Sequence, residues 1–198
     1  MDGIELSSQQ LERNRLDVLP DPMVRGRRNP LHFGLASRLK RARRMADLSY
    51  NSLAKAAGLQ HANTVFQLER KPDHVPRCDT VERVAYALGL SPAFLAYGIE
   101  ADASQPTEGL RSDGVASRLR QTRLDRGLTM RALARASGLT DTAVRSTETG
   151  ASMPSIATVE AFAVALCVSP AWLAYGLGTV ELPKRQRTVT APSEPCPG

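Results

Sequence analysis

The sequence predicts an all-α fold, and three observations support this prediction. Leu and Ala supply most of the apolar content, whereas aromatic residues make up only 5% of the chain. No stretch alternates apolar and polar residues as a half-buried strand would. The chain also contains an internal repeat with helical spacing. The segment ASRLKRARRMADLSYNSLAKAAGL, from Ala36, realigns on ASRLRQTRLDRGLTMRALARASGL, from Ala116, at an offset of 116 − 36 = 80.

The repeat continues further along the chain. TVERVAYALGLSPAFLAYG, from Thr80, realigns on TVEAFAVALCVSPAWLAYG, from Thr158, at an offset of 158 − 80 = 78. The first copy therefore holds two extra residues between Leu59 and Thr80, and one structural unit is duplicated. The predicted organisation is a flexible N-terminal segment at 1–32, a first domain at 33–99, a linker at 100–113, a second domain at 114–178 and a disordered tail at 179–198.

Each copy predicts five short helices. In the first copy, Leu35, Leu39 and Ala42 lie on one face of an amphipathic helix. Ser49 is a suitable N-cap for a second helix, Tyr50 to Ala57, which ends at Gly58 because glycine adopts a left-handed conformation without a Cβ penalty.

The remaining helices of the first copy are predicted from apolar spacing and helix-starting residues in the same way. A third helix is expected from Ala62 to Leu68, with Val65 and Leu68 facing inward, and a fourth from Thr80 to Leu88. Ser91 and Pro92 then supply a cap and an N1 proline for the fifth.

The second copy repeats these signals. Thr129 stands at the position of Ser49, Gly138 occupies the turn, Thr140 is the next cap, and Ser169 precedes the proline that opens the last helix. We therefore expect the same five helices in both copies.

Positive charge is concentrated in the two repeated regions. The chain has a net charge of +6, and residues 33–99 contain ten Lys/Arg against five Asp/Glu. Residues 114–178 contain seven against four, whereas the linker, 100–113, contains one against four and is acidic. Two basic domains joined by an acidic linker are compatible with a polyanionic partner.

Several classes of protein are disfavoured. No apolar run approaches the roughly 18 residues of a membrane span, and the polar N-terminus does not resemble a signal peptide, so a soluble, intracellular protein is expected. Cys78, Cys167 and Cys196 form no Cys-x-x-Cys pair, so neither a metal site nor a disulfide framework is indicated. His32, His61 and His74 are interpreted as surface or loop residues, as is Cys78. Without a phosphate loop or a catalytic motif, we expect neither enzyme activity nor a cofactor.

One motif occurs in both copies: Leu-Ala-x-x-(Ala/Ser)-Gly-Leu, a helix ending in Glu, then Pro, Thr-Val and Ala-x-x-Leu. Its positions are Leu53, Ala54, Ala57, Gly58, Leu59, Glu69, Pro76, Thr80, Val81, Ala85 and Leu88, and again Leu133, Ala134, Ser137, Gly138, Leu139, Glu148, Pro154, Thr158, Val159, Ala163 and Leu166. This pattern resembles the lambda-repressor/Cro (Xre) family over about two-thirds of the chain.

The resemblance implies two tandem five-helix lambda-repressor-like domains joined by the acidic linker. It further implies a sequence-specific, double-stranded DNA-binding transcription regulator of prokaryotic or phage type. A repressor is favoured because an operator-bound domain blocks polymerase. The expected location is the cytoplasm, in association with the nucleoid. The expected partners are double-stranded DNA, a second copy of the chain in a homodimer, and RNA polymerase or a regulatory protein.

In this family the second helix of the motif enters the major groove. The resemblance places base-reading positions of the first copy at Ala62, Asn63 and Gln67, and Asn and Gln side chains can bond bidentately to adenine. Thr64 is a candidate for a phosphate or a thymine methyl contact, whereas Arg70 and Lys71 would contact phosphates. The alternative for Asn63 and Gln67 is a solvated polar helix face.

The second copy differs at these positions. Asp141, Thr142 and Ser146 stand there, with Arg145 beside the last, and Thr147 replaces the inward-facing Leu68. An Asp facing the groove is repelled by phosphates unless it accepts a bond from a cytosine amine. The second domain is therefore predicted to bind DNA more weakly, to read another sequence or to serve in dimerisation, with Thr142, Arg145 and Ser146 as its contacts.

Two further features follow from the resemblance. The family often has a Gln at the second residue of the helix before the turn, where this chain has Tyr50 and Met130; Tyr50 is kept as a candidate DNA contact. Some members pair the motif's Glu with an Arg of the first helix. This implies a partly buried Arg43–Glu69 pair and an Arg123–Glu148 pair, both structural.

The segments around the domains suggest further contacts. Arg25, Arg27 and Arg28 precede the first domain and form either a basic arm that reaches into a groove or solvated charges of a disordered leader. The fourteen-residue linker spans about 46–50 Å when extended. Both domains of one chain could therefore engage neighbouring sites, or two chains could dimerise through their second domains.

A different class of function stays open. The acidic linker and Asp141 would suit a protein-binding anti-activator or antitoxin-like module, whose tandem domains grip a protein partner. Asn63, Gln67 and the basic first domain favour DNA instead.

Overall fold

The computed structural model describes residues 30–71, 74–101 and 109–181, and within these ranges every regular element is a helix. The first half of the chain holds η1 (Leu31–Gly34), α2 (Leu35–Met45), α3 (Tyr50–Ala56), α4 (Ala62–Arg70), α5 (Cys78–Ala87) and α6 (Pro92–Tyr97). The second half holds η2 (Arg111–Gly114), α7 (Val115–Asp125), α8 (Met130–Ser137), α9 (Asp141–Glu148), α10 (Ile156–Ala165) and α11 (Pro170–Tyr175). The predicted all-α class is confirmed.

Most predicted helix starts are confirmed by their capping contacts. The side chains of Ser49, Thr129, Thr140 and Ser169 each accept a hydrogen bond from the backbone N–H three residues on, which satisfies one of the free donors of a first turn. Ser91 differs, because it precedes α6 but its hydroxyl makes no capping bond. Pro92, at the first position of α6, sets the backbone for the helix there.

Three helices of the first half have other bounds than predicted. The second ends at Ala56, one residue before the predicted Ala57. The third continues past Leu68 to Arg70, where the N–H of Lys71 still bonds the carbonyl of Gln67. The fourth runs from Cys78 to Ala87 rather than from Thr80 to Leu88. Its early start has a tertiary cause, since the Cys78 N–H donates to the carbonyl of Pro154 in the other half of the chain.

The turn before each candidate recognition helix needs glycine. Gly58, two residues past the end of α3, and Gly138, directly after α8, adopt φ values of +63° and +69°. Side chains with a Cβ rarely occupy this region, so the predicted role of both glycines is confirmed.

An apolar core fills both halves. Leu39, Leu53 and Val65 are fully buried in the first half, as are Leu119, Leu133 and Val144 in the second, with Leu68 also buried as predicted. Thr147 is buried at the position equivalent to Leu68, and its hydroxyl donates to the carbonyl of Ala143 at 2.8 Å. This bond satisfies the hydroxyl within its own helix, although a threonine fills less of the core than a leucine.

An arginine ties the first helix of each half to the end of its last helix. Arg38 of α2 donates to the carbonyls of Leu95 and Ala96 at 3.0 and 2.8 Å. Arg118 of α7 donates to Leu173 and Ala174 at 2.9 and 2.6 Å. A cation suits these sites because the last carbonyls of a helix lack partners and carry partial negative charge.

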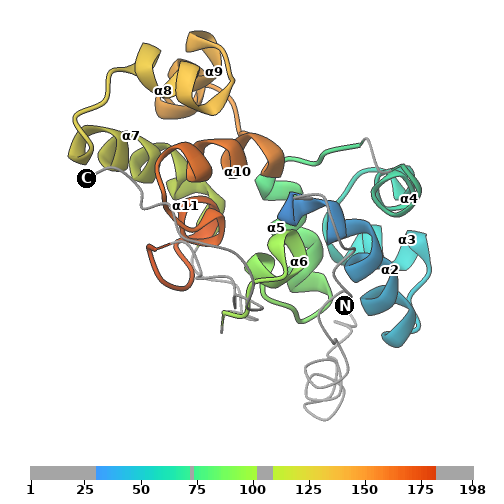
Figure 1. The fold of residues 1–198 in the computed structure, drawn as a ribbon. Helices are drawn as coiled ribbons and strands as arrows, with labels where there is room; N and C mark the ends of the chain where they lie inside the picture. Colours follow the sequence, from blue (N-terminus) through green and yellow to red (C-terminus); the bar gives the residue numbers. More distant parts are fainter. Residues whose placement is uncertain (1–29, 72–73, 102–108, 182–198) are drawn as a thin grey trace.

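The two halves lie directly against each other. In Figure 1, α2–α4 and α8–α9 lie on opposite sides of a centre that contains α5, α6, α10 and α11. α6 packs on α11, η1 contacts α10 and η2 contacts α5. The predicted linker is shortened from its far end, since Arg111–Gly114 forms η2; residues 102–108 lie outside the described part.

Candidate nucleic-acid interface

The α3–turn–α4 segment presents one face of α4 to solvent. Val65 and Leu68 are buried against the core, so the opposite face of the helix is open. This face carries Asn63 and Arg70, both exposed, and the half-buried Gln67. The half-buried Thr64 lies beside it. The structure thus brings these predicted contact residues together on a single helix.

A buried ion pair holds α4 on α2. Arg43 Nε lies 2.6 Å from Glu69 Oε1 and Arg43 Nη2 lies 3.1 Å from Glu69 Oε2, while Nη1 donates to the carbonyl of Leu48 at 2.7 Å. The hydrogen bond to Glu69 is the main reason that the pKa of Arg43 is raised. The predicted pair is confirmed, and its two-point geometry fixes the end of α4.

Tyr50 belongs to the support of α4. Its hydroxyl donates to Glu69 Oε2 at 3.2 Å, and the Arg43 guanidinium lies 4.2 Å from the centre of its ring. Its ring also meets Phe66 edge-on, with centres 5.6 Å apart. These contacts give Tyr50 a packing role that the motif did not indicate, and its DNA contact stays a prediction.

Phe66 was missed by the sequence reasoning. Its side chain is 39% exposed on α4, and the Arg70 guanidinium lies 5.7 Å from the centre of its ring. Residues 63, 66, 67 and 70 share one face at helical spacing. An aromatic residue three positions after Asn63 was the available signal.

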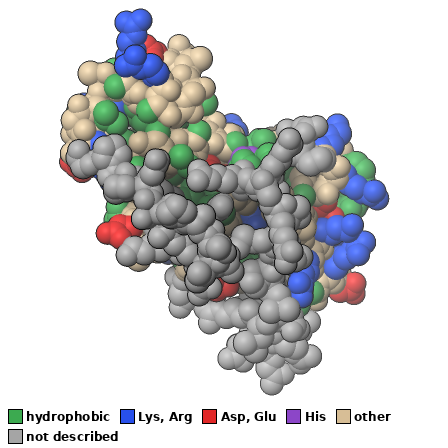
Figure 2. All heavy atoms as spheres, in the orientation of Figure 1, with side chains coloured by type: hydrophobic (Ala, Val, Ile, Leu, Met, Phe, Trp, Pro, Cys, Tyr) green, Lys and Arg blue, Asp and Glu red, His purple; other side chains and the backbone are tan. Residues whose placement is uncertain are grey.

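Positive side chains surround this helix. Figure 2 shows Lys and Arg gathered on the side formed by α2–α4. The exposed members are Lys40, Arg41, Arg44, Lys55, Arg70 and Lys71. Lys71 follows α4 directly, so two predicted phosphate contacts, Arg70 and Lys71, stand at the same helix end.

The equivalent helix of the second half, α9, has the same support but another surface. Arg123 Nε and Nη2 lie 2.6 and 2.9 Å from the two carboxylate oxygens of Glu148, which confirms the second predicted pair. Thr142 and Arg145 are exposed. Ser146 is half-buried, and its hydroxyl donates to the carbonyl of Ala143 at 3.2 Å.

Two expectations about isolated residues are wrong. His32 is not a surface residue, since its side chain is 11% exposed and its Nδ1 lies 2.6 Å from Glu160. Cys78 is fully buried at the start of α5, and burial raises the pKa of its thiol. Both lie where the two halves meet, a contact that the repeat did not reveal. His61 and His74 are exposed, as expected.

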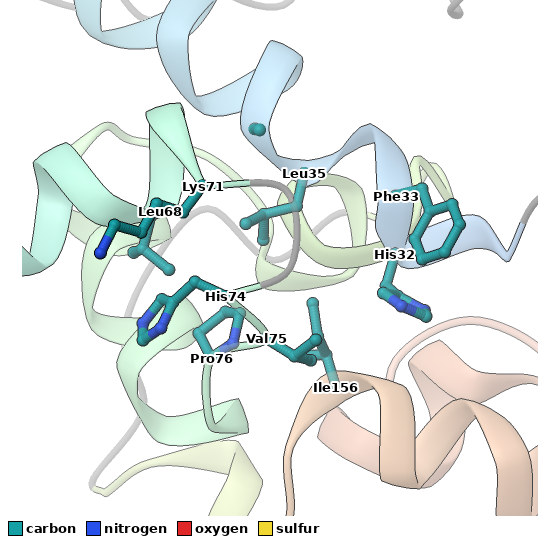
Figure 3. Close-up of a pocket in the computed structure, with 10 residues that line it drawn as sticks. His32, Phe33, Leu35, Leu68, Lys71, His74, Val75, Pro76 and Ile156 are labelled. Atoms are coloured by element: carbon teal, nitrogen blue, oxygen red, sulfur yellow. The ribbon is translucent and has the colours of Figure 1, made fainter.

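A small, mainly apolar pocket opens next to His32 and His74. Figure 3 shows that these two side chains lie at different ends of it, with Val75 and Ile156 between them. The polar groups that line the pocket do not converge on a single point. Among the described residues, no three His, Cys, Asp or Glu form a group that could hold a metal.

Arg25, Arg27 and Arg28 lie outside the described residues. In the part of the chain that is described, no helix is both long enough and apolar enough to cross a membrane.

Comparison with known proteins adds one match. A family model described as a helix-turn-helix domain matches residues 115–175, the span of α7–α11. No curated protein and no solved structure matches the chain. The match supports a helix-turn-helix DNA-binding family and lies within the second half of the chain, the half that contains α9.

Proposed function

We propose that this chain is a sequence-specific transcription regulator of prokaryotic or phage type that binds double-stranded DNA. It acts as a repressor, in the cytoplasm and on the nucleoid. Its DNA-binding units are two tandem domains of the lambda-repressor/Cro (Xre) type, at 33–99 and 114–178, and α4 of the first domain reads the major groove.

The main support for this proposal is the arrangement of side chains on the surface of α4. Asn63 and Gln67 share its open face, and the buried Arg43–Glu69 pair holds the helix in place. Amide side chains on a fixed helix are suited to bidentate bonds with adenine N6 and N7. Phe66, beside them, is suited to apolar contact with a thymine methyl.

The charges around α4 support the same function. Arg70 and Lys71 at its end and the cations of α2 would contact phosphates of the duplex if α4 entered the groove. Phosphate contacts of this kind position the protein, whereas base contacts select the sequence. On α9 we assign weaker or different reading to Thr142, Arg145 and Ser146. The arm residues Arg25, Arg27 and Arg28 would add minor-groove or phosphate contacts.

The second candidate, a protein-binding module, has Asp141 in its favour. Asp141 is exposed at the first position of α9, where it would face the phosphates. A single carboxylate is outweighed by the surface of α4. Because the two halves already pack against each other within one chain, DNA binding does not require the homodimer that the resemblance implied.

Selection of bound sequences from random duplex DNA by the full chain, at physiological salt, tests the proposal. We expect an enriched motif that the Asn63→Ala and Gln67→Ala variants select less strongly. An enriched motif that both variants bind unchanged would overturn the assignment of α4. No enriched motif at all would favour the protein-binding module.

A further inference from the structure

We propose that the two halves of one chain take the place of the two subunits of a dimer. A single chain binds, through α4 and α9 together, a non-palindromic DNA site made of two unlike half-sites at fixed spacing. This inference rests on the proposed function and extends it to the form of the DNA target. It departs from the flexible linkage that the sequence suggested, since the contact between the halves sets how α4 and α9 are placed.

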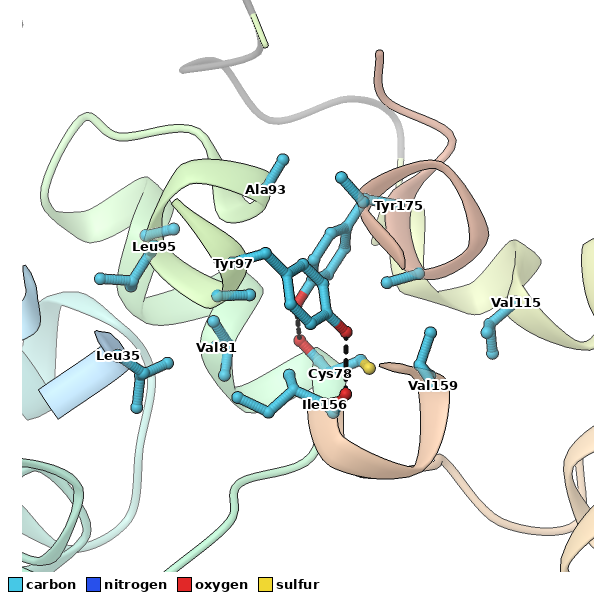
Figure 4. Close-up of a cluster of buried hydrophobic side chains, with 14 of the residues drawn as sticks. Leu35, Cys78, Val81, Ala93, Leu95, Tyr97, Val115, Ile156, Val159 and Tyr175 are labelled. Atoms are coloured by element: carbon cyan, nitrogen blue, oxygen red, sulfur yellow. Dashed lines mark hydrogen bonds between the residues drawn. The ribbon is translucent and has the colours of Figure 1, made fainter. Parts of the chain in front are cut away.

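The first observation is a reciprocal pair of tyrosine hydrogen bonds. The hydroxyl of Tyr97 donates to the carbonyl of Ile156 at 3.0 Å, and the hydroxyl of Tyr175 donates to the carbonyl of Cys78 at 3.4 Å. Both pairs are related by the repeat offset, since 175 − 97 and 156 − 78 each equal 78. Figure 4 shows the two bonds side by side, crossing between the halves in opposite directions.

The backbone repeats this reciprocity. The N–H of Cys78 donates to the carbonyl of Pro154, and the N–H of Ile156 donates to the carbonyl of Pro76, both at 3.0 Å. Between them, Arg77 pairs with Ser155, its own equivalent. The rings of Tyr97 and Tyr175, also equivalents, lie 6.5 Å apart. Residues that meet their own equivalents mark an approximate two-fold axis.

Two buried carboxylates extend the pattern. Glu82 of α5 accepts the N–H groups of Arg111 and Ser112 at 2.6 and 2.8 Å. Glu160 of α10 accepts those of Leu31 and His32 at 2.6 and 3.2 Å. The donors obey the first repeat offset, since 111 − 31 and 112 − 32 each equal 80. Each half thus docks its first turn on the fourth α-helix of the other.

These contacts have the arrangement of a symmetric dimer interface. In such an interface the same patch of both subunits is buried, and residue i meets j where j meets i. Here both patches belong to one chain, so a second copy cannot use the same surface. Helix-turn-helix dimers place two recognition helices on half-sites about 34–36 Å apart. The approximate two-fold within the chain relates α4 to α9, as the two-fold of such a dimer relates its two recognition helices.

The two reading surfaces differ. Asn63 and Gln67 of α4 correspond to Thr142 and Ser146 of α9, at an offset of 79 in both cases. An amide side chain and a short hydroxyl side chain make different bonds to base edges. One chain therefore reads two different half-sites, and its target lacks the palindrome that a homodimer requires.

The test uses the full chain and the sequence that it selects. We expect the chain to be monomeric in solution at micromolar concentration by light scattering. We also expect a one-to-one complex with the duplex by native mass spectrometry. Inserting two or five base pairs between the half-sites should weaken binding about tenfold or more. A fixed spacing has this consequence, whereas domains on a flexible tether would adapt to the longer site.

Paired variants assign each half-site. Asn63→Ala should lose discrimination only at the first half-site, and Ser146→Ala only at the second. A palindromic motif bound by two chains would overturn the inference while leaving the proposed function standing, as would unchanged binding after the insertions. Failure to enrich any motif would overturn both.

Discussion

Glu82 and Glu160 occupy equivalent positions on α5 and α10, and each accepts two backbone N–H groups from the first turn of the opposite half. Both side chains are buried. A buried carboxylate is costly unless hydrogen bonds satisfy it. The stability of each half therefore depends on the hydrogen bonds that its glutamate accepts from the first turn of the other half. Stability and assembly of the two halves are coupled through these residues.

The contact at Glu160 predicts a pH dependence. Burial alone would raise the pKa of Glu160, but the hydrogen bonds from His32 and Leu31 outweigh it and lower the pKa below its ordinary value of 4.5. The folded protein then binds fewer protons than the unfolded chain, so this stabilisation is complete above about pH 5. It is lost as the pH falls through the folded pKa.

Urea unfolding of the wild type and of Glu160→Gln between pH 7 and pH 3 measures this loss. The free energy of unfolding of the wild type should exceed that of the variant at pH 7, and the difference should shrink below pH 5. A difference that stays constant over the whole range would contradict the prediction.

The reciprocal tyrosines predict unequal effects of two matched substitutions. Tyr97→Phe and Tyr175→Phe each remove a buried hydrogen bond to the carbonyl of the first residue of a helix, at a cost of about 0.5–1.5 kcal/mol. Tyr97→Phe should cost more, because its bond to Ile156 is 3.0 Å long and that of Tyr175 to Cys78 is 3.4 Å. Chemical denaturation measures both. Val164→Ala, at a side chain that is 61% exposed, serves as the neutral control. Variants indistinguishable from that control would contradict the prediction.

The ion pair beneath α4 predicts a large loss when one partner is removed. Arg43→Met leaves the buried carboxylate of Glu69 uncompensated, and the free energy of unfolding should fall by about 3–5 kcal/mol. Adding Glu69→Leu removes the stranded charge and should restore most of the loss. Equilibrium denaturation of the single and double variants checks this. Equal instability of the two would show that the stranded charge is not the cause.

The proposed reading helix predicts two kinds of binding defect. Asn63→Ala should lower discrimination between the selected site and unrelated DNA by about 1–3 kcal/mol. Arg70→Ala should weaken binding to all duplexes and reduce the slope of log affinity against log salt by about one. Binding titrations at several salt concentrations separate the two. Loss of specificity in Arg70→Ala, without a change in slope, would contradict its assignment to a phosphate.

Local structure could be predicted from the sequence because its causes are local. The caps at Ser49, Thr129 and Thr140 and the left-handed turns at Gly58 and Gly138 follow from side-chain chemistry within a few residues. The Arg43–Glu69 pair was predictable for another reason, since a resemblance to known proteins carried it. The exposed face of α4 followed from the burial of Val65 and Leu68.

The contact between the halves could not be predicted in the same way. A repeat shows that two units are alike, but it does not show which surfaces they turn towards each other. His32 and Cys78 were therefore placed on the surface. A signal was nevertheless present, since Glu82 and Glu160 recur at the same position of the Thr-Val-Glu segment in both copies. Tyr97 and Tyr175 likewise recur in identical surroundings.

The internal two-fold arrangement also changes what a mutation can do. In a homodimer encoded by one gene, each substitution occurs twice, so both half-sites must change together. If α4 and α9 read separate half-sites, as proposed, a substitution in α9 would alter one half of the target and leave α4 unchanged. Specificity could then evolve one half-site at a time, while the other half kept the protein on its DNA.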